Sequence, residues 1–561
     1  MIKQTPSRAI TLFTVLSCLV LTACGGRDST DESAHWAAGE MDDILTEFKP
    51  DAPSEQGDWL MLRLPAEMPH LNPLTSTDHY ASTMLAWISD TLLDRDPETV
   101  ESIPNAAKAW EISDDHLEYT FYLREDMHFS DGEPVTAHDV KFTYEMLMDP
   151  GVDAPHLRSY FNDVIKCEVL DDHTVRFTCS RPYYRHLVMI GGLSIMPEHI
   201  YGEGDFNNHP NNRSPVGSGM YVLERWETGQ QLSLTRNPHY WGKEETGRPW
   251  FDRIVYSVIT DDNTAFQVLA RGDLDFMTMP AETFMRRANT SRFKERFNRF
   301  AYSRPAYNYI GWNMRRPLFS DKETRLALTK LLDRELIRDE IYYGQAQIVS
   351  GNFMPDTPEH NDAISPVPFD PDAAVALLEE AGWRMGSDGV LARDGIRFRF
   401  EVGTTIQNPV AEKILTLYKE ELARVGIEMV IRPMEWASLL DRVDRRDFDA
   451  ILMGWSMPPD PDPYQVWHSS QAEAGSNYVG FINEESDALI EQARTEFDRD
   501  KRIALYHRFQ EILHEEQPYL FLLAPKQLAA GDKRIHGIQV YPFGVEQREW
   551  FVPTALQRYG Q

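Results

Sequence analysis

Cysteine is scarce in this sequence, with only four among 561 residues. Cys18 lies in an apolar run near the start and Cys24 ends that run, which leaves Cys167 and Cys179 as the remaining pair. These two flank a predicted hairpin with its turn at Asp171–His173, and an even pair outside the cytoplasm can form a disulfide. The sequence leaves two alternatives, a cross-strand disulfide or two small buried thiols, because it does not give the Cα separation.

Long apolar runs are also lacking. The only candidate, Ile10–Leu21, has about 12 residues, whereas a membrane-spanning helix needs about 20. Basic residues precede it, and this combination is typical of a secretory signal. The run ends in Leu21-Thr22-Ala23-Cys24, which resembles a bacterial lipobox, although an ordinary signal with a chance cysteine is the alternative. We expect residues 1–23 to be a signal peptide and Cys24 to carry a lipid that anchors a protein working outside the cytoplasm.

Basic residues are outnumbered, with 56 Lys and Arg against 88 Asp and Glu and a net charge of −32. Nucleic-acid binding depends on basic patches that neutralise phosphates, so this composition disfavours it. The acidity favours solubility and says little about the fold.

Recognisable catalytic motifs are missing as well. The sequence has no Walker phosphate loop, no HExxH zinc helix and no Gly-x-Ser-x-Gly elbow. His128, His138, His199 and His239 are scattered among polar residues without the close spacing of metal ligands. These absences lower the expectation of an enzyme, and we expect no cofactor. A secreted hydrolase is kept as an alternative.

The chain is long enough for several cores. About 538 residues follow the predicted signal, too many for one hydrophobic core, so two or three lobes are expected. Residues 24–57 are polar and acidic, which predicts a flexible tether. Order is expected to begin with a strand at 59–64.

Two helix starts carry capping-box patterns. Thr136 with Asp139 precedes an apolar helical face, and Ser320 with Glu323 precedes another. Both pairs predict the first residues of helices.

The region between about 397 and 456 predicts a parallel α/β lobe. Strands and helices alternate there with short connections, over the ranges 397–402, 408–426, 427–432, 436–446 and 449–455. In such sheets ligands bind beyond the carboxyl ends of the strands. This favours the loops 403–407, 433–436 and 456–464. The first half is richer in strands, so the predicted fold class is α/β, with α+β in the first lobe.

Ordered blocks along nearly the whole mature chain resemble family 5 extracellular solute-binding proteins, the dipeptide, oligopeptide and nickel receptors of ABC importers. The stretch from Phe129 to Val140, Phe-Ser-Asp-Gly-Glu-Pro-Val-Thr-Ala-His-Asp-Val, resembles the family signature. Further blocks are Leu71–Leu74, Thr91–Asp94, Ala109–Asp115, Tyr119–Arg124, Pro215–Tyr221, Arg236–Trp241, Ala373–Trp383 and Gly475–Tyr478.

The resemblance implies a two-lobed periplasmic-binding-protein fold (class II, cluster C) with a hinge and a ligand trapped between the lobes. Its expected limits are 58–302 for lobe I with an extra subdomain at about 91–214, 303–525 for lobe II, and 526–561 for a return to lobe I. It implies a monomeric receptor, not an enzyme, that delivers a peptide or small molecule to an ABC permease with a cytoplasmic ATPase. Gly25 after the lipidated cysteine favours the outer membrane, facing the periplasm, if the host has two membranes.

The sequence departs from the dipeptide receptors at both charged positions. Their ligand-amine Asp corresponds to Pro458, and their carboxylate-binding Arg corresponds to Thr405. A buried ligand charge without its partner is costly, so a free dipeptide held in the usual way is doubtful. Asp460 or Asp462 could supply a displaced carboxylate, or their Pro-rich segment is simply a stiff loop.

The candidate ligand-binding residues combine the favoured loops with the family's positions. Trp436 matches a ligand-stacking Trp of the dipeptide receptors, and Trp455 ends a strand; either could instead belong to the core. The full set is Asn72, Thr404, Thr405, Trp436, Trp455, Ser456, Asp460 and Asp462. Alternatives with the same fold are a metal chelate, an oligosaccharide or an end-blocked peptide as ligand, or a sensory receptor.

Overall fold

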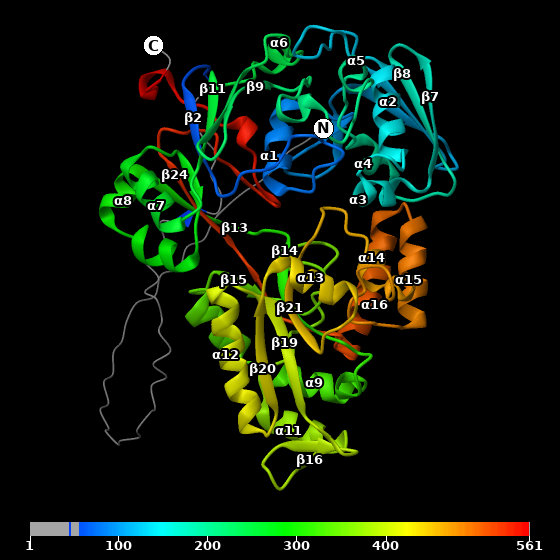
Figure 1. The fold of residues 1–561 in the computed structure, drawn as a ribbon, viewed down its shortest axis with the longest axis vertical. Coiled ribbons are helices and arrows are strands. Elements are labelled where there is room, and N and C mark those ends of the chain that lie inside the picture. The colour runs from blue at the N-terminus through cyan, green and yellow to red at the C-terminus, as the bar shows by residue number, and fades with distance from the viewer. Residues whose placement is uncertain (1–43, 46–54, 560–561) are drawn as a thin grey trace, which may run out of the picture. The chain divides into compact units, whose positions relative to one another are not determined.

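The computed structural model describes residues 44–45 and 55–559 (Figure 1). The predicted signal peptide, Cys24 and most of the predicted tether lie outside the described residues. Two pieces of that tether are structured, however. Ile44–Leu45 form strand β1, and the Gln56 side chain donates a hydrogen bond to the carbonyl of Gly247 at 2.7 Å. Both pieces thus have backbone partners within the described chain.

An eight-stranded sheet gathers strands from both ends of the described chain. β24, near the C-terminus, is antiparallel to both of its neighbours, and β2, near the N-terminus, is parallel to β11. Across the sheet the strands are β1 (Ile44–Leu45), β13 (Phe297–Tyr302), β24 (Gln527–Asp532), β12 (Phe276–Thr278), β2 (Trp59–Leu64), β11 (Arg253–Val258), β10 (Gln231–Arg236) and β9 (Tyr221–Glu227). The predicted strand at 59–64 is confirmed as β2.

A five-stranded sheet holds the predicted parallel unit. It contains β20 (Glu428–Met434), β19 (Arg399–Thr405), β21 (Ala450–Ser456), β14 (Ala306–Trp312) and β22 (Tyr519–Phe521). β20 and β21 are both parallel to β19, and helices α12 (Pro409–Arg424) and α13 (Trp436–Asp444) connect them in the predicted order. The parallel α/β prediction is therefore confirmed. At one side the sheet is extended by β14, which is antiparallel to β21, and then by β22, which is antiparallel to β14.

The chain passes between these two sheets at two neighbouring points. Residues 303–305 join β13 to β14, and residues 522–526, which include the short strand β23 (Leu523–Pro525), join β22 to β24. Tyr302 lies opposite Gln527 in the antiparallel pair β13–β24, so the two connections run side by side.

A four-stranded sheet and the helices α2 (Ala137–Met148) and α4 (His186–Gly191) form what we call the β5–β8 subdomain. Its antiparallel strands are β5 (Ala107–Ile112), β6 (Glu118–Leu123), β8 (Thr174–Cys179) and β7 (Val164–Asp171). β7 and β8 form the predicted hairpin. The buried aromatic and aliphatic residues of this subdomain form a core of their own.

Cys167 and Cys179 are free thiols in this hairpin, so the disulfide alternative is wrong. Cys167 lies opposite Phe177 and Cys179 lies opposite Val164, which places the two cysteines at different rungs of the ladder. Both are buried in the subdomain core, and that burial raises the pKa of each thiol to about 12. The structure therefore agrees with the other alternative from the sequence, in which both cysteines are small buried thiols.

Capping explains where the predicted helices begin. The capping box of Thr136 and Asp139 is present at the start of α2. The box predicted at Ser320 is wrong, because Asp321 caps helix α9 (Lys322–Lys330) by accepting a hydrogen bond from the Thr324 amide at 2.8 Å. A carboxylate is the stronger acceptor at the positive end of a helix, and the Asp321 carboxylate also binds Arg393 at 2.7 Å.

The remaining elements surround these sheets (Figure 1). The longer helices are α1 (His79–Ile88), α7 (Asp262–Arg271), α8 (Ser291–Arg296), α11 (Pro371–Glu380), α15 (Glu484–Thr495) and α16 (Arg499–Glu516). The helices of three or four residues are α3 (Pro155–Arg158), α5 (Glu198–Tyr201), α6 (Lys243–Thr246), α10 (Arg334–Leu336) and α14 (Tyr464–Trp467). The small strands are β3 (Leu93–Arg95), β4 (Ser102–Pro104), β15 (Ala346–Ile348), β16 (Arg384–Met385), β17 (Leu391–Arg393), β18 (Ile396–Arg397), β25 (Val540–Tyr541) and β26 (Gly544–Val545).

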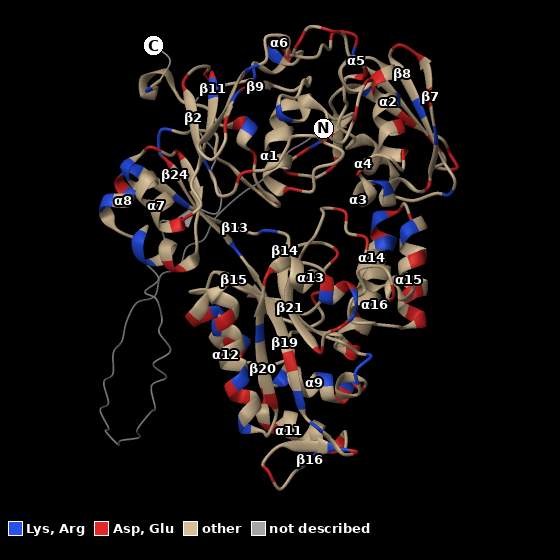
Figure 2. Ribbon diagram, viewed as in Figure 1, with Lys and Arg blue, Asp and Glu red and all other residues tan. Residues whose placement is uncertain are grey.

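Surface helices such as α12 and α15 carry charges of both signs (Figure 2). Their mixture agrees with solvent-facing helices supported by local ion pairs rather than a basic face for nucleic acid. No helix in the part of the chain that the structure describes is long and apolar enough to cross a membrane.

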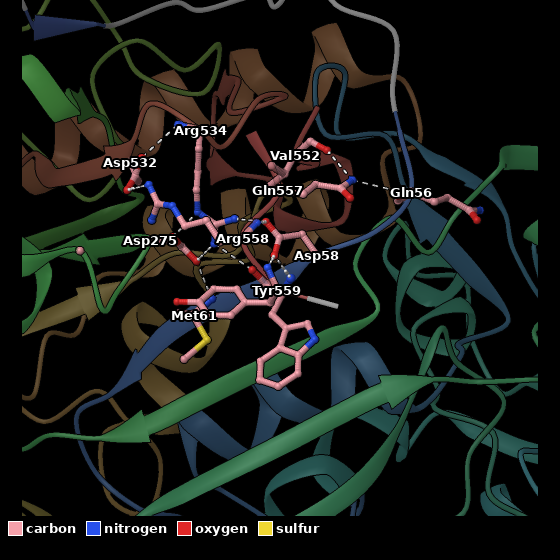
Figure 3. A network of polar contacts seen from close by, with 12 residues as sticks. Gln56, Asp58, Met61, Asp275, Asp532, Arg534, Val552, Gln557, Arg558 and Tyr559 are labelled. Atoms are coloured by element: carbon pink, nitrogen blue, oxygen red, sulfur yellow. Dashed lines mark hydrogen bonds and ion pairs between the residues drawn. The ribbon is translucent and has the colours of Figure 1, made fainter. Parts of the chain in front are cut away.

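A buried polar network connects Asp58, near the start of the continuous described range 55–559, to the last two residues of that range (Figure 3). Arg534 donates to both oxygens of Asp275, at 2.9 and 2.6 Å, and forms a second ion pair with Asp58. The backbone amides of Arg558 and Tyr559 donate to the Asp58 carboxylate at 3.0 and 2.7 Å. Arg534, Asp58 and Asp275 are at most 3% exposed. The eight-stranded sheet therefore depends on a charge network whose members come from both ends of the sequence.

A single buried carboxylate predicts a pH-dependent stability. Asp90 is 9% exposed and accepts a hydrogen bond from the Trp241 indole at 3.1 Å, and burial raises its pKa from 3.8 to about 6. Because the folded pKa exceeds the unfolded one, the stability that this group contributes is complete below about pH 4 and is lost as the pH rises to about 6. Asp90→Asn is expected to exceed the wild type in unfolding free energy by about 2–3 kcal/mol at pH 7.5, and to match it near pH 4.

Urea denaturation of both proteins at the two pH values measures this difference. An equal difference at both values would show that Asp90 does not take up a proton on folding.

Candidate ligand-binding cavity

A cavity of about 890 Å³ lies between the β5–β8 subdomain and the segment that follows β21. This volume falls within the range of about 300–1,000 Å³ that is common for ligand sites. The lining residues come from 159–185, from 455–476 and from three single positions: Tyr307, Asn352 and Arg494. The segment after β21 leaves the carboxyl end of a parallel strand, where ligands bind in such sheets.

One wall of the cavity is aromatic. Trp455, the penultimate residue of β21, stacks almost parallel to Tyr309 and Tyr478, with ring centroids 6.3 and 6.1 Å away. Its indole donates to the hydroxyl of Tyr519 at 3.3 Å, and Tyr519 itself stacks on Tyr309 at 3.8 Å. Because the partner tyrosines are fixed by their own packing, the Trp455 ring is held as a rigid apolar surface.

Most of the charged side chains that line the cavity are already paired. Asp462 accepts hydrogen bonds from the Tyr183 hydroxyl at 2.6 Å and the Tyr464 amide at 3.0 Å, and it forms an ion pair with Arg494 at 3.0 Å. Arg181 donates to Asp163 at 2.8 Å. Asp462 is therefore committed to these partners and does not offer a free carboxylate.

Tyr184 makes several contacts between the β5–β8 subdomain and the residues after β21. Tyr184 donates to the carbonyl of Pro461 at 2.8 Å and lies 3.2 Å from the hydroxyl of Tyr506. The guanidinium of Arg502 lies over the Tyr184 ring at 4.1 Å. Burial raises the pKa of Tyr184 well above its ordinary value, so this hydroxyl stays a hydrogen-bond donor at any physiological pH.

Two polar side chains that line the cavity have buried nitrogen or oxygen atoms with neither a hydrogen bond nor an ion pair to another described residue. Asn352 is completely buried, and neither its amide nitrogen nor its amide oxygen has a hydrogen-bond partner among the described residues. Arg185, from the subdomain, likewise has a buried Nε without a hydrogen-bond partner. Unpaired buried polar groups are rare in native proteins, and a site for a polar ligand is one explanation.

Three of the candidate residues predicted from the sequence, Trp455, Ser456 and Asp462, line this cavity. Of the three favoured loops, only 456–464 contributes to it. Gly403 and Met434, from the regions of the other two loops, line a separate space of about 40 Å³, which is too small for a solute.

The other five candidates do not line the cavity. Asn72 is buried, and its side-chain oxygen accepts from the amides of Leu74 and Thr75 at 2.9 and 3.2 Å, which fixes its own loop. Asp460 pairs with Arg95 at 3.4 Å. The remaining three are Thr404, which is buried, Thr405, which ends β19, and Trp436, which begins α13 and is 52% exposed.

Sequence reasoning missed Tyr183, Arg185, Tyr307 and Asn352. None of them belongs to a loop at the end of a parallel strand or to one of the family positions, which were the two sources of the predicted site residues. The only local signal was the polar and aromatic run 181–186 just after a hairpin strand. The fold brings it against a segment nearly 280 residues later, since Tyr183 and Asp462 are 279 positions apart.

The described residues do not form a metal-binding cluster. Among residues 44–45 and 55–559, no group of three or more His, Cys, Asp or Glu side chains could hold a metal ion.

The fold of this chain is similar to that of solved solute-binding proteins. The chain superposes on the structure of the oligopeptide-binding protein AppA from Bacillus subtilis in complex with a nonapeptide, with a TM-score of 0.76 and 29% identity, covering 90% of this chain and 100% of that one. It also matches NikZ from Campylobacter jejuni in complex with Ni(L-His), with a TM-score of 0.75 and 24% identity, covering 89% of this chain and 100% of that one. The fold is that of the two-lobed periplasmic binding proteins.

The family follows from the sequence comparisons. Residues 101–477 match the model of the bacterial extracellular solute-binding proteins, family 5. The oligopeptide-binding protein AppA of Bacillus subtilis is 31% identical over 555 residues, covering 95% of this chain and 96% of that protein. The chain belongs to the family 5 extracellular solute-binding proteins, as its sequence motifs predicted.

Proposed function

We propose that this chain is the substrate-binding protein of an ABC importer, that it captures peptides in the 890 Å³ cavity, and that it is not an enzyme. The observation that carries the proposal is the cavity's combination of a fixed aromatic wall at Trp455 with accessible polar side chains such as Ser456 and Arg185. A peptide offers apolar side chains together with polar groups, and a lining of this mixed kind complements both. Relatives named as oligopeptide- and dipeptide-binding proteins support the same ligand class.

Delivery to a membrane partner completes the proposal. Closure of the two lobes about their paired connections would present a bound-state surface to a permease that works with a cytoplasmic ATPase. We further propose that the protein is monomeric, with lobes bounded near residues 302 and 526, and that Cys24 carries a lipid anchor in the cell envelope, facing the periplasm where the host has two membranes. The lipobox-like sequence before Cys24 supports the anchor.

A thermal-shift screen tests the ligand class. Tri-, penta- and nonapeptides of alanine and leucine are compared with oligosaccharides and a nickel–histidine chelate. A ligand at a hundredfold excess over its dissociation constant is expected to stabilise the protein by about 2.7 kcal/mol, because it binds only the folded state. Stabilisation by peptides alone supports the proposal. Stabilisation by the chelate or a sugar, without any effect of peptides, would replace it with another solute class.

A further inference from the structure

The charges that line the cavity do not balance. Five charged side chains among the described lining residues face it: Asp163, Arg181, Arg185, Asp462 and Arg494. Four of them form two ion pairs, between Asp163 and Arg181 and between Asp462 and Arg494. Arg185 alone forms no ion pair within 4.0 Å with a carboxylate of the described chain, so the lining carries one excess positive charge.

The surroundings of Arg185 do not neutralise that charge. Its polar neighbour is the hydroxyl of Tyr183, which is neutral and donates its own proton to Asp462. Asp462 lies near enough to influence Arg185 but is held by Arg494, so two guanidinium groups share one carboxylate at this end of the cavity. Arginine does not lose its proton in proteins. Asp462 therefore compensates part of the Arg185 charge from a distance, while no carboxylate of the described chain pairs with this guanidinium directly.

We propose that Arg185 binds a carboxylate of the ligand, and that the cavity therefore selects solutes that carry one. This inference rests on the proposed function and deepens it by naming the charged group of the substrate. A guanidinium can hold a carboxylate through two parallel hydrogen bonds, which gives orientation as well as affinity. The carboxylate can come from the C-terminus of a peptide or from an acidic side chain, and both have the same chemistry. Position Thr405, where the dipeptide receptors would place their Arg, is then not needed for this task.

The test uses peptides of alanine and leucine in two forms, with a free or an amidated C-terminus, and measures Kd by calorimetry. The wild type is expected to bind the free form about tenfold or more tightly than the amide, because a hydrogen bond to a charged group is worth about 1.5–3 kcal/mol. Arg185→Gln is expected to bind the two forms within about twofold of each other. A third arm, an amidated peptide with one internal aspartate, distinguishes the two sources, because recovery of tight binding assigns the site to an acidic side chain.

Controls separate a local role from a loss of folding. Arg176→Gln removes a guanidinium of the same subdomain that pairs with Glu118 and does not line the cavity, and it should keep the preference for the free form. Arg185→Lys should keep part of that preference, since the charge remains and the forked geometry is lost. If the wild type binds both forms equally, or if Arg185→Gln keeps the preference, the inference about Arg185 fails while the peptide proposal stands. If no peptide binds in any form, the proposed function itself fails.

Discussion

Replacing Trp455 with alanine is expected to weaken peptide binding at least about 30-fold, which corresponds to about 2 kcal/mol or more. The ring provides the aromatic wall of the cavity and is held between Tyr309 and Tyr478. Large, rigid aromatic side chains in the centre of a binding site dominate affinity because they remove apolar surface from water at little entropic cost. Calorimetry with the alanine and leucine peptides measures the loss.

Trp436→Ala provides the matched comparison. Trp436 is 52% exposed at the start of α13 and does not line the cavity, so its replacement is expected to change Kd by less than about twofold. The sequence favoured Trp436 as a ligand contact by analogy with the dipeptide receptors. A loss confined to Trp436→Ala would move the ligand to that position and contradict the cavity described here.

Replacing Arg534 with methionine is expected to lower the unfolding free energy by about 3–5 kcal/mol. The side chain compensates two carboxylates, Asp58 and Asp275, that are each 1% exposed. Removing one partner of a buried ion pair leaves the other charge without solvent or counter-ion, and here two such charges are left. Urea denaturation at pH 7.5 measures the change.

Arg225→Met is the control for this variant. Arg225 lies on β9 of the same sheet, its side chain is 61% exposed, and it forms an ion pair with Glu227 at the surface. Its replacement is expected to change stability by less than about 0.5 kcal/mol. A loss of under about 1 kcal/mol in Arg534→Met would mean that the two carboxylates take up protons or water at little cost, and the network would not be a major source of stability.

The first helix of the parallel unit was predictable because both of its ends are marked in the sequence. Asn408 caps α12 by accepting from the Ala411 amide at 3.0 Å, and Pro409 occupies the first helical turn, as the local pattern indicated. Gly426, just after the helix, has φ +83°, a conformation that glycine adopts without strain. Local rules were sufficient wherever both partners of an interaction lie within a few residues.

The same rules failed where the decisive partner is distant or where neighbours compete. Ser320 and Asp321 are adjacent candidates for one cap, and the choice of Asp321 is favoured by Arg393, more than seventy residues later. Cys167 and Cys179 flank the right turn, but the register of the hairpin separates them.

For the cavity, the strand-end rule found Trp455 and Ser456, which follow from β21. Residues such as Arg185 and Asn352 line the same space only because the folded chain places their segments there, and no short sequence pattern marks them. The ligand charge that the cavity favours follows from which charged lining residues form ion pairs and which do not. Those pairs are known only from the three-dimensional structure.

The position of β24 has a consequence for how the protein is made. This strand lies between β13 and β12 in the middle of its sheet, and the residue that follows it by two positions, Arg534, pairs with Asp58 across 476 positions of sequence. A ribosome must therefore synthesise nearly the entire polypeptide before the sheet that contains its earliest strands can close. Contacts this far apart form slowly because a long loop must first be ordered, so this sheet is expected to be completed late in folding.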